Sequence, residues 1–514
     1  MKNKIITLGV LLLTLLVTSC HSDSDVIMSY ANGDALSFAE AEKSYAGKYR
    51  VFWKALNTNY ALWDYEKEYG LDWDAHYAKF LPQFEALDKE GNVSDDELQE
   101  LMTEMAEPLH DGHLFIQFQN HATGNFIPVC PSVTRNRKRD DYISAISFKP
   151  SLKYYYNNLA EYKDYSSKVN DQLIYVLRTK GIGYNWALTR IEELQIKDNP
   201  SEAEAIEMQE LLEFCQAMDK LNNMSINEKA VIYYNNLVAK YSHLNIPNLD
   251  PIDISFVNNG IRLTYGLFTD GIAYFYLSGF GLTPYLNKEA MAQTFSGDSH
   301  MASIVDRVKD VWESWFDAIQ DLHKKGKLKG VIVDVRSNGG GMMYDSYYVL
   351  GSILPAGGFQ AGYARFKRGV ARYDYSPMMP FVMQTMKETH EVINDVPVVV
   401  LANGRSVSMS EITSCCAKEM PNGRVIGSIT HGGLCCLTDI SNFSSNYNGH
   451  IGIEDKTPVY CYTPTIEFFN NEKKCLEGIG VTPDIEVAFD DKLFKNTGQD
   501  NQLDRALEYI RTGK

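Results

Sequence analysis

The spacing of apolar and polar positions divides the chain into three regions. Residues 36–120 and 121–253 place most of their apolar residues at helical spacing, whereas strands alternate with helices over residues 254–514. In the first region, Ser94–Glu97 forms a capping-box pattern, which predicts the start of a helix. A short apolar strand at 114–118 then closes a helical N-terminal domain, and this strand follows the candidate histidine discussed below.

The second region, residues 121–253, is predicted as a mostly helical insert. Its clearest element is an amphipathic helix that begins near Pro200 and reaches Leu221. A peptide-binding PDZ module is not evident, because the region lacks a glycine-rich carboxylate-binding loop.

The third region, residues 254–514, shows the pattern of an α/β domain with a layered sheet. Several of its strands are apolar and β-branched over their whole length, which is typical of strands buried on both faces. The predicted strands and helices lie at 272–277, 301–323, 331–335, 344–354, 397–401, 408–420 and 424–427.

The N-terminus has the pattern of an export signal. Lys2 and Lys4 precede an uncharged apolar run, Ile5–Val17, which is too short to span a bilayer. Val17–Cys20 resembles the lipobox of bacterial lipoproteins, so residues 1–19 are expected to be a signal peptide and Cys20 the lipidated residue. The alternative is an ordinary secretory signal with a chance cysteine. Residues 20–35 would then form a polar tether outside the cytoplasm.

Composition narrows the class of function. The chain has 514 residues, 45% of them apolar, and a formal net charge of -17. A nucleic-acid-binding protein needs a basic surface, and none is visible here. The length favours two or three domains.

The cysteines allow two interpretations. An exported chain can form disulfides, and six cysteines lie between 415 and 475. They can equally be buried thiols that act as small apolar residues. No CxxC pair is present, which argues against a zinc site.

A candidate nucleophile lies where the strand at 397–401 turns into a helix. A serine at a helix N-terminus lies beside unpaired amides that favour a developing negative charge. Three serines alternate here, Ser406, Ser408 and Ser410, and the residues alone do not choose between them. The competing interpretation is structural, because Ser408-x-x-Glu411 is also a capping box.

Three further segments carry possible chemistry. Asp334–Gly341 ends in three glycines after a buried strand, which suits backbone amides directed at an oxyanion or, alternatively, a tight turn; it lacks the pattern of a phosphate-binding loop. His113 could be a general base, and Glu477, before a glycine-rich turn, could orient it. Each segment alone could be an ordinary turn.

Together and in this order, these segments resemble the C-terminal-processing and tricorn-core family of serine peptidases. The resemblance rests on Asp334–Gly341, Ser406–Glu411, Gly427–Gly433 and Glu477–Asp484, with the segment ending Asp111-Gly112-His113 ahead of the core. It implies a crotonase/ClpP-like spiralling ββα core. It also implies that Ser408 is the nucleophile and that the oxyanion hole comes from Met409 with Gly340 or Gly341.

One departure selects the branch of the family. Peptidases of the Ser-Lys type have a lysine in the loop after the nucleophile, where this chain has Gly433. The tricorn-like branch uses an N-terminal histidine and a late glutamate, which His113 and Glu477 would supply. His431, in the same loop as Gly433, is the rival base. This branch also has a serine directly before its histidine, where this chain has Gly112.

The expected protein is therefore a lipid-anchored serine endopeptidase of the bacterial cell envelope, periplasmic or exposed on the outer membrane. Its substrate would be a peptide or an unfolded protein. The membrane would be reached through the lipid alone, and no metal or organic cofactor is implied. Two other functions remain open: a non-catalytic binding protein and a small-ester hydrolase on the same fold.

Overall fold

A computed structural model gives the fold of the chain. It describes residues 38, 41–146, 148–166, 183–197, 199–224, 228–247, 249, 261–287, 299–351, 353, 359–368, 371–383, 393–437 and 450–514. The predicted signal peptide (1–19), the predicted lipidation residue Cys20 and the tether (20–35) lie outside the described residues.

The chain forms two compact units. The first combines residues 1–151 with residues 335–514, and the second comprises residues 152–334. The first unit therefore brings the two ends of the chain together. His113, Ser408 and Glu477 all belong to it, and the candidate site can be described within this unit alone.

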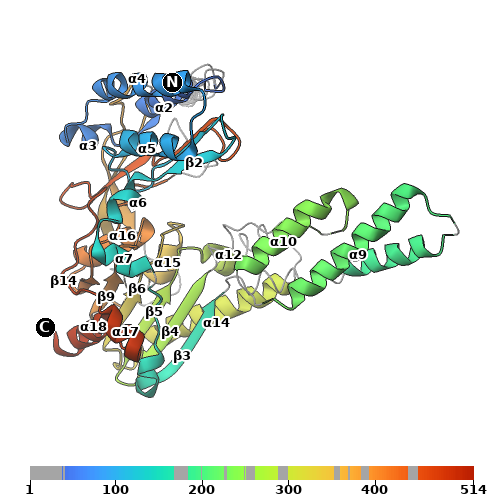
Figure 1. The fold of residues 1–514 in the computed structure, drawn as a ribbon. Helices are drawn as coiled ribbons and strands as arrows, with labels where there is room; N and C mark the ends of the chain where they lie inside the picture. Colours follow the sequence, from blue (N-terminus) through green and yellow to red (C-terminus); the bar gives the residue numbers. More distant parts are fainter. Residues whose placement is uncertain are drawn as a thin grey trace, which may run out of the picture. The chain divides into compact units, whose positions relative to one another are not determined.

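Helices form the N-terminal part of the first unit (Figure 1). The predicted capping box is present at the last of them: Glu97 N–H donates to Ser94 Oγ, and Glu97 Oε2 accepts from Ser94 N–H. The helix predicted from this pattern is confirmed. The helices are α2 (Tyr45–Asn59), α3 (Trp63–Glu68), α4 (Trp73–Glu90) and α5 (Asp95–Ala106).

An antiparallel sheet packs against these helices. Its strand order is β11-β12-β1-β2, and Ile116 pairs with Cys461 at its centre. Apolar side chains of the helices and of this sheet form one core, which includes Phe52, Phe84 and Phe118. The strands are β1 (Phe115–Gln119), β2 (Phe126–Val129), β11 (His450–Ile451) and β12 (Val459–Tyr462), followed along the chain from β2 by helices α6 (Pro131–Asn136) and α7 (Asp140–Ile146).

Parallel strands carry the candidate nucleophile. The strand β9 is buried over its whole length and pairs with β10, which in turn pairs with β14. Helices α16 and α18 both pack against β9 and β10. The predicted strand, helix and strand at 397–401, 408–420 and 424–427 are confirmed. The elements are β9 (Val398–Ala402), α16 (Met409–Glu419), β10 (Gly423–Gly427), β14 (Ile485–Glu486), α17 (Asp491–Thr497) and α18 (Asn501–Thr512).

A small antiparallel sheet completes the first unit. Its order is β13-β7-β8, with bounds β7 (Phe359–Phe366), β8 (Met379–Met383) and β13 (Ile466–Phe469). Helix α15 covers only Asp345–Val349, so the helix predicted at 344–354 is shorter than expected. Gly351 follows two residues later, and glycine is a poor helix former.

The second unit contains strands and long helices. β3 pairs with β4 and β4 with β5 in antiparallel fashion, whereas β5 and β6 are parallel. Helices α9 and α10 pack against each other through an apolar core that includes Phe214 and Tyr241. The elements are η1 (Lys153–Asn158), β3 (Leu159–Ser166), α9 (Glu202–Asn222), α10 (Glu228–Tyr241), η2 (Ser242–Leu244), β4 (Arg262–Phe268), β5 (Ile272–Leu277), α12 (Thr283–Leu286), α14 (Ser299–Lys324) and β6 (Gly330–Asp334).

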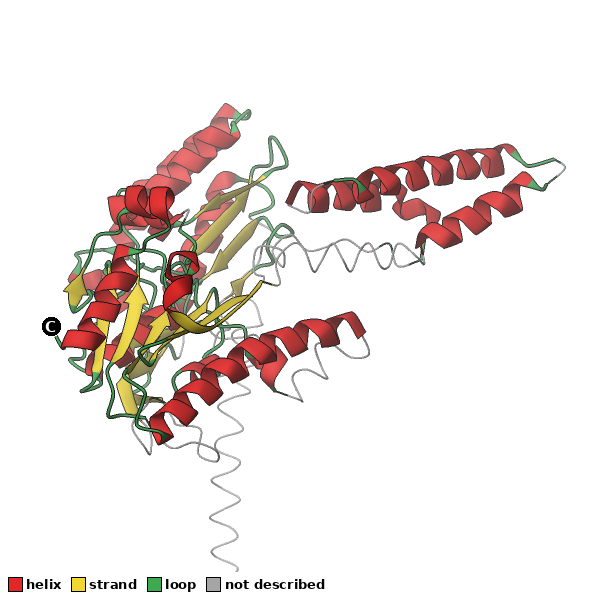
Figure 2. Cartoon of the chain, turned by 90° about the horizontal axis from the view of Figure 1, so that it is seen from below, coloured by secondary structure: helices red, strands yellow, loops and turns green. Residues whose placement is uncertain are grey.

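The α/β class predicted from the sequence is confirmed, as Figure 2 shows with strands and helices in contrasting colours. The predicted strands at 272–277 and 331–335 and the helices near 200–221 and 301–323 are also present. Two strands, β2 and β3, were not predicted inside residues 121–253. β3 is an edge strand, and most of its side chains are polar and at least partly exposed. It therefore lacks the apolar alternation of a half-buried strand.

A buried ion pair fixes the segment that leads to the glycine-rich loop. Both terminal nitrogens of Arg336 bind Asp500, at 3.0 and 2.8 Å, and the guanidinium lies 4.4 Å from the centre of the Phe148 ring. The side chains of Arg336 and Asp500 are 0% and 1% exposed. Asp500 is also the N-cap of α18, because its side chain accepts a hydrogen bond from the amide of Leu503.

We expect Asp500→Ala to lower the free energy of unfolding by about 3–5 kcal/mol, because it removes the carboxylate that neutralises the buried Arg336 charge. Urea unfolding of the two proteins measures the difference. Asp491→Ala is the control, since the Asp491–Lys495 pair is exposed and should contribute less than about 1 kcal/mol. Equal effects of the two substitutions would contradict this account.

Candidate active site

The turn between β9 and α16 holds Ser408 in an unusual backbone conformation. Its φ is +58° and its ψ is −117°, a region that residues other than glycine rarely adopt. Such a turn lifts the side chain away from the helix axis, as a strained turn between a strand and a helix does for a nucleophile. Ser408 is partly exposed, so its hydroxyl can meet a substrate.

The other two serines of the turn have structural roles. Ser406 is fully buried; its hydroxyl donates to Val335 O at 2.8 Å and accepts from Asn403 N–H. Ser410 is also buried and donates to Asn338 O at 2.9 Å. These bonds attach the turn that carries Ser408 to Val335 and to the glycine-rich loop. Among the three serines, the geometry favours Ser408 as the reactive one.

The glycine-rich loop lies directly against Ser408. A Cβ at Gly340 would approach Ser408 Cβ at 2.6 Å, and the φ of Gly340 is +89°, so only glycine fits there. The amide of Gly340 already donates to Asn338 Oδ1 at 2.8 Å. Gly341 is therefore the better of the two predicted oxyanion donors. In the described part of the chain, the amide of Met409 donates to no acceptor, as expected for the first residue of a helix.

The segment that carries His113 packs on the loop beneath Ser408. Ser408 N–H donates to Gly433 O at 2.9 Å, and a Cβ at Gly112 would lie 2.4 Å from Gly433 Cα and 2.2 Å from Gly432 O. The loop residues 432–433 thus lie between the nucleophile turn and Gly112. This packing explains why the chain has glycine where the tricorn-like branch has serine: there is no room for a side chain.

The imidazole of His113 is available as a base. Burial lowers the pKa of His113 to about 4, so the ring is neutral near pH 7. Its Nδ1 is buried and has no hydrogen-bond partner among the described residues. A neutral imidazole can accept the proton of a serine hydroxyl, as a general base requires.

Glu477 fixes the backbone around His113. Its carboxylate is fully buried and accepts from the amides of Gly112, Leu434 and Cys435 at 2.7–2.8 Å. Burial, followed by the nearby charge of Asp111, raises the pKa of Glu477 to about 8. Glu477 therefore joins the histidine segment to the loop that follows the nucleophile.

Asp111 is a site residue that the sequence analysis missed. It is fully buried; its Oδ1 accepts from the amide of His113 at 2.7 Å and its Oδ2 from the hydroxyl of Thr463 at 2.6 Å. Burial raises the pKa of Asp111 to about 7. The signal in the sequence was an aspartate two residues before the histidine, which is a common spacing for a side chain that caps a turn.

The three side chains of Asp111, His113 and Glu477 lie close together. One ligand atom of each lies within 4.8 Å of the others, so these are the residues that could hold a small cation. Each carboxylate already accepts three hydrogen bonds from protein donors. The arrangement equally suits a carboxylate that stabilises the imidazolium of His113 during catalysis.

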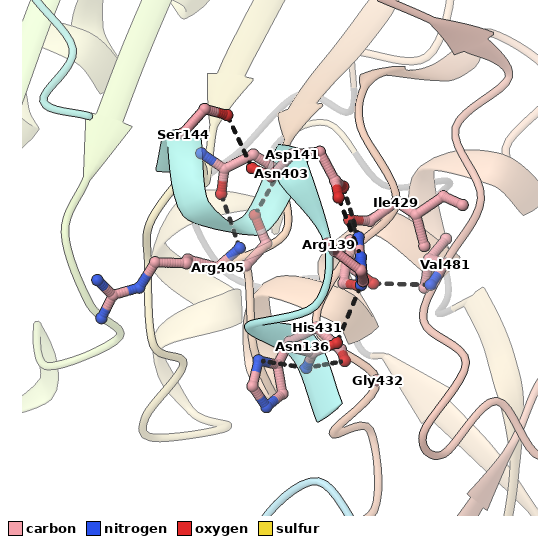
Figure 3. Close-up of polar contacts among 12 residues, drawn as sticks. Asn136, Arg139, Asp141, Ser144, Asn403, Arg405, Ile429, His431, Gly432 and Val481 are labelled. Carbon is pink, nitrogen blue, oxygen red and sulfur yellow. Dashed lines mark hydrogen bonds and ion pairs between the residues drawn. The ribbon is translucent and has the colours of Figure 1, made fainter. Parts of the chain in front are cut away.

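His431, the rival base, is held by Asn136 (Figure 3). The Nδ2 of Asn136 donates to His431 O at 2.9 Å and lies 3.1 Å from His431 Nδ1, while Asn136 Oδ1 accepts from Arg139. These contacts fix the orientation of the amide, so Nδ1 must accept and the proton of His431 sits on Nε2. Burial and nearby positive groups lower the pKa of His431 to about 3.

The cysteines outside the signal region are free thiols. All eight of them lie among the described residues, and six are buried, namely Cys215, Cys415, Cys416, Cys435, Cys461 and Cys475. The sequence allowed either disulfides or buried free thiols, and the structure has free thiols, most of them buried.

One model of a known protein family matches part of the chain. Residues 293–487 match the model of peptidase family S41, and this stretch contains the glycine-rich loop, the Ser408 turn and Glu477. The match covers less than half of the chain. The resemblance drawn from the four motifs is confirmed.

Individual relatives are distant. A carboxy-terminal-processing protease of Bartonella bacilliformis is 26% identical over 202 residues, which cover 39% of this chain and 41% of that protein. Among solved structures, mature CPAF complexed with lactacystin is 11% identical, with a TM-score of 0.48 over 92% of this chain and 100% of that one. The tricorn protease is 18% identical, with a TM-score of 0.26 over 47% of this chain and 18% of that one.

The close packing of Gly112 generates a prediction. Gly112→Ala should lower the free energy of unfolding by about 1–3 kcal/mol, because the added methyl group meets the backbone of the 432–433 loop. Thermal or urea unfolding measures this loss. Gly281→Ala is the matched control, since a Cβ there meets nothing within 4 Å. A Gly112→Ala protein as stable as the wild type would show that the two loops are not in contact.

Four buried carboxyl groups predict how stability depends on pH. Burial raises the pKa of each above its usual value in an unfolded chain, so the folded state holds protons that the unfolded state has lost. Their contribution is complete at low pH and disappears as the pH rises through their folded pKa values. The groups and approximate pKa values are Asp111 (about 7), Glu411 (about 7), Glu467 (about 7) and Glu477 (about 8).

We therefore expect the free energy of unfolding to fall by roughly 2–4 kcal/mol between pH 6.5 and 8. Three histidines offset this only in part. The pKa values of His76, His113 and His431 are lowered to about 4, 4 and 3, so these rings are neutral in the folded state, and in the unfolded state they lose only their remaining protons as the pH rises from 6.5. Urea titrations across this range measure the slope, and Glu467→Gln should make it shallower. Stability that is constant or rises over the range would contradict the prediction.

Proposed function

We propose that this protein is a serine endopeptidase in which Ser408 attacks, His113 is the general base and Glu477 orients and stabilises the histidine. The observation that carries the proposal is the packing at the 432–433 loop. The carbonyl oxygen of Gly433 in this loop accepts a hydrogen bond from the amide of Ser408, and the loop also contacts Gly112. This packing supports a site that contains both a nucleophile in a strained turn and a neutral histidine.

The residues suit each step of acyl transfer. His113 removes the proton of Ser408 as its Oγ attacks the scissile carbonyl carbon, and the oxyanion that forms meets the amides of Met409 and Gly341. The imidazolium then gives its proton to the leaving amine, and the acyl enzyme remains. A water molecule that loses a proton to His113 hydrolyses this ester and restores Ser408. Glu477, whose side chain lies close to that of His113, stabilises the imidazolium in both halves when it is ionised.

The substrate and location follow from the same proposal. We propose a peptide or an unfolded protein as substrate, in the cell envelope, with lipid at Cys20 as the membrane anchor. None of the described helices is long and apolar enough to cross a bilayer. The formal net charge of -17 would repel nucleic-acid phosphates, so we propose no nucleic-acid partner.

Labelling with a fluorophosphonate tests the nucleophile and the base together. The protein without residues 1–20 should label, Ser408→Ala should not, and His113→Ala should label about 10²–10⁴-fold more slowly, because an alcohol is a weak nucleophile without a base. His431→Ala should label at a rate close to that of the wild type, since the proton of His431 sits on Nε2. A large loss in His431→Ala with little loss in His113→Ala would exchange the two roles.

Digestion of casein separates the remaining functions. A peptidase should cleave casein, and Ser408→Ala should leave it intact. A protein that labels and hydrolyses small esters but leaves casein intact would be an ester hydrolase. A wild-type protein that neither labels nor cleaves would be a binding protein on a peptidase fold.

A further inference from the structure

Glu411 does more than cap a helix. In the sequence it completes a capping box with Ser408. In such a box the glutamate side chain accepts a hydrogen bond from the backbone amide of the N-cap residue, here Ser408. In the structure that bond is the longest of its contacts, at 3.2 Å. Three shorter bonds connect Glu411 to the loop at 430–433, which is not part of the helix.

The carboxylate of Glu411 is fully buried and shared between two segments. Its Oε1 accepts from the hydroxyl of Thr430 at 2.5 Å and the amide of Gly432 at 2.7 Å, and its Oε2 accepts from the amide of Gly433 at 2.7 Å and from that of Ser408. Two oxygens thus accept four hydrogen bonds. All four donors are neutral, so the carboxylate is stabilised by aligned N–H and O–H dipoles.

Both segments that Glu411 joins are parts of the candidate site. Gly433 O accepts from Ser408 N–H, so the nucleophile turn and the loop are connected in both directions. Thr430 Oγ1 also accepts from Val481 N–H at 2.7 Å, and Val481 lies in the same segment as Glu477. Gly112, next to His113, packs on the other side of the loop. A displacement of this loop would move the base relative to the nucleophile.

We propose that Glu411 is a positioning residue that holds Ser408 in its strained turn and keeps the 430–433 loop at the correct distance from it. A backbone with positive φ at a residue other than glycine persists only where its surroundings impose it. The hydrogen bonds from Ser408 N–H to Gly433 O and to Glu411 provide that constraint. This inference rests on the proposed function, in which Ser408 is the nucleophile.

Glutamine at position 411 should disrupt this arrangement while keeping its size. Each carboxylate oxygen accepts two donors, so an NH₂ group in place of either one faces at least one N–H donor. Even if the hydroxyl of Thr430 turned to accept from the NH₂ group, the amide of Gly432 would still face that group without an acceptor. The loop must then shift, and the orientation of the nucleophile must shift with it.

The experiment compares Glu411→Gln with Glu467→Gln. Glu467 is a second buried glutamate with a raised pKa, but it pairs with Arg365 in the β13-β7-β8 sheet. We expect Glu411→Gln to lower kcat on a peptide substrate and the rate of fluorophosphonate labelling about 10–100-fold, with KM within about threefold of the wild type. Glu467→Gln should change kcat by less than about threefold, whatever it does to the melting temperature.

The outcomes are distinct. Equal loss of kcat in the two variants, or a loss in Glu411→Gln that appears in KM alone, would overturn the positioning role. If Glu411→Gln does not fold, Thr430→Val removes one of the four donors, and its kcat should fall with KM unchanged; an unchanged kcat would overturn the inference. A wild-type protein that does not label would instead reject the proposed function itself.

Discussion

The candidate site depends on two buried carboxylates that hold one loop. Glu411 binds the amides of Gly432 and Gly433, and Glu477 binds those of Leu434 and Cys435. Four successive amides of this loop therefore donate to two acidic side chains from different parts of the chain. Burying a carboxylate is costly unless donors surround it, and here the donors belong to the loop itself. The loop in turn contacts both Ser408 and Gly112, the residue before His113.

This arrangement explains which parts of the site were visible in the sequence. The strand, turn and helix around Ser408 follow from local apolar spacing and from a serine at a helix start, and the structure has them where they were predicted. The choice between Ser406, Ser408 and Ser410 could not be made locally. It depends on which hydroxyl finds a backbone acceptor in another segment, and those acceptors, Val335 O and Asn338 O, belong to the glycine-rich loop region.

Long-range packing accounts for what the sequence did not reveal. Asp111 looked like a turn residue, and its burial beside Glu477 depends on strands β1 and β12 coming together from opposite ends of the chain. Likewise, Gly112 looked like a missing polar partner, but it is a contact point between two loops. The strand β3 was missed for a different reason: its polar side chains carry no apolar period, and its partner β4 begins about a hundred residues later.

The same loop also distinguishes the two histidines, of which His431 is buried and His113 half-buried, although both rings are neutral. His431 belongs to the loop and is held at its carbonyl and its Nδ1 by Asn136, so its tautomer is fixed by a neutral amide. His113 lies across the loop, has an unpaired Nδ1 and has two carboxylates close to its ring. A base that becomes an imidazolium is stabilised by acidic groups nearby. Two acidic side chains lie close to His113, whereas the groups that shift the pKa of His431 after burial are basic. The charge distribution around the ring, rather than proximity alone, therefore favours His113 as the partner of Ser408.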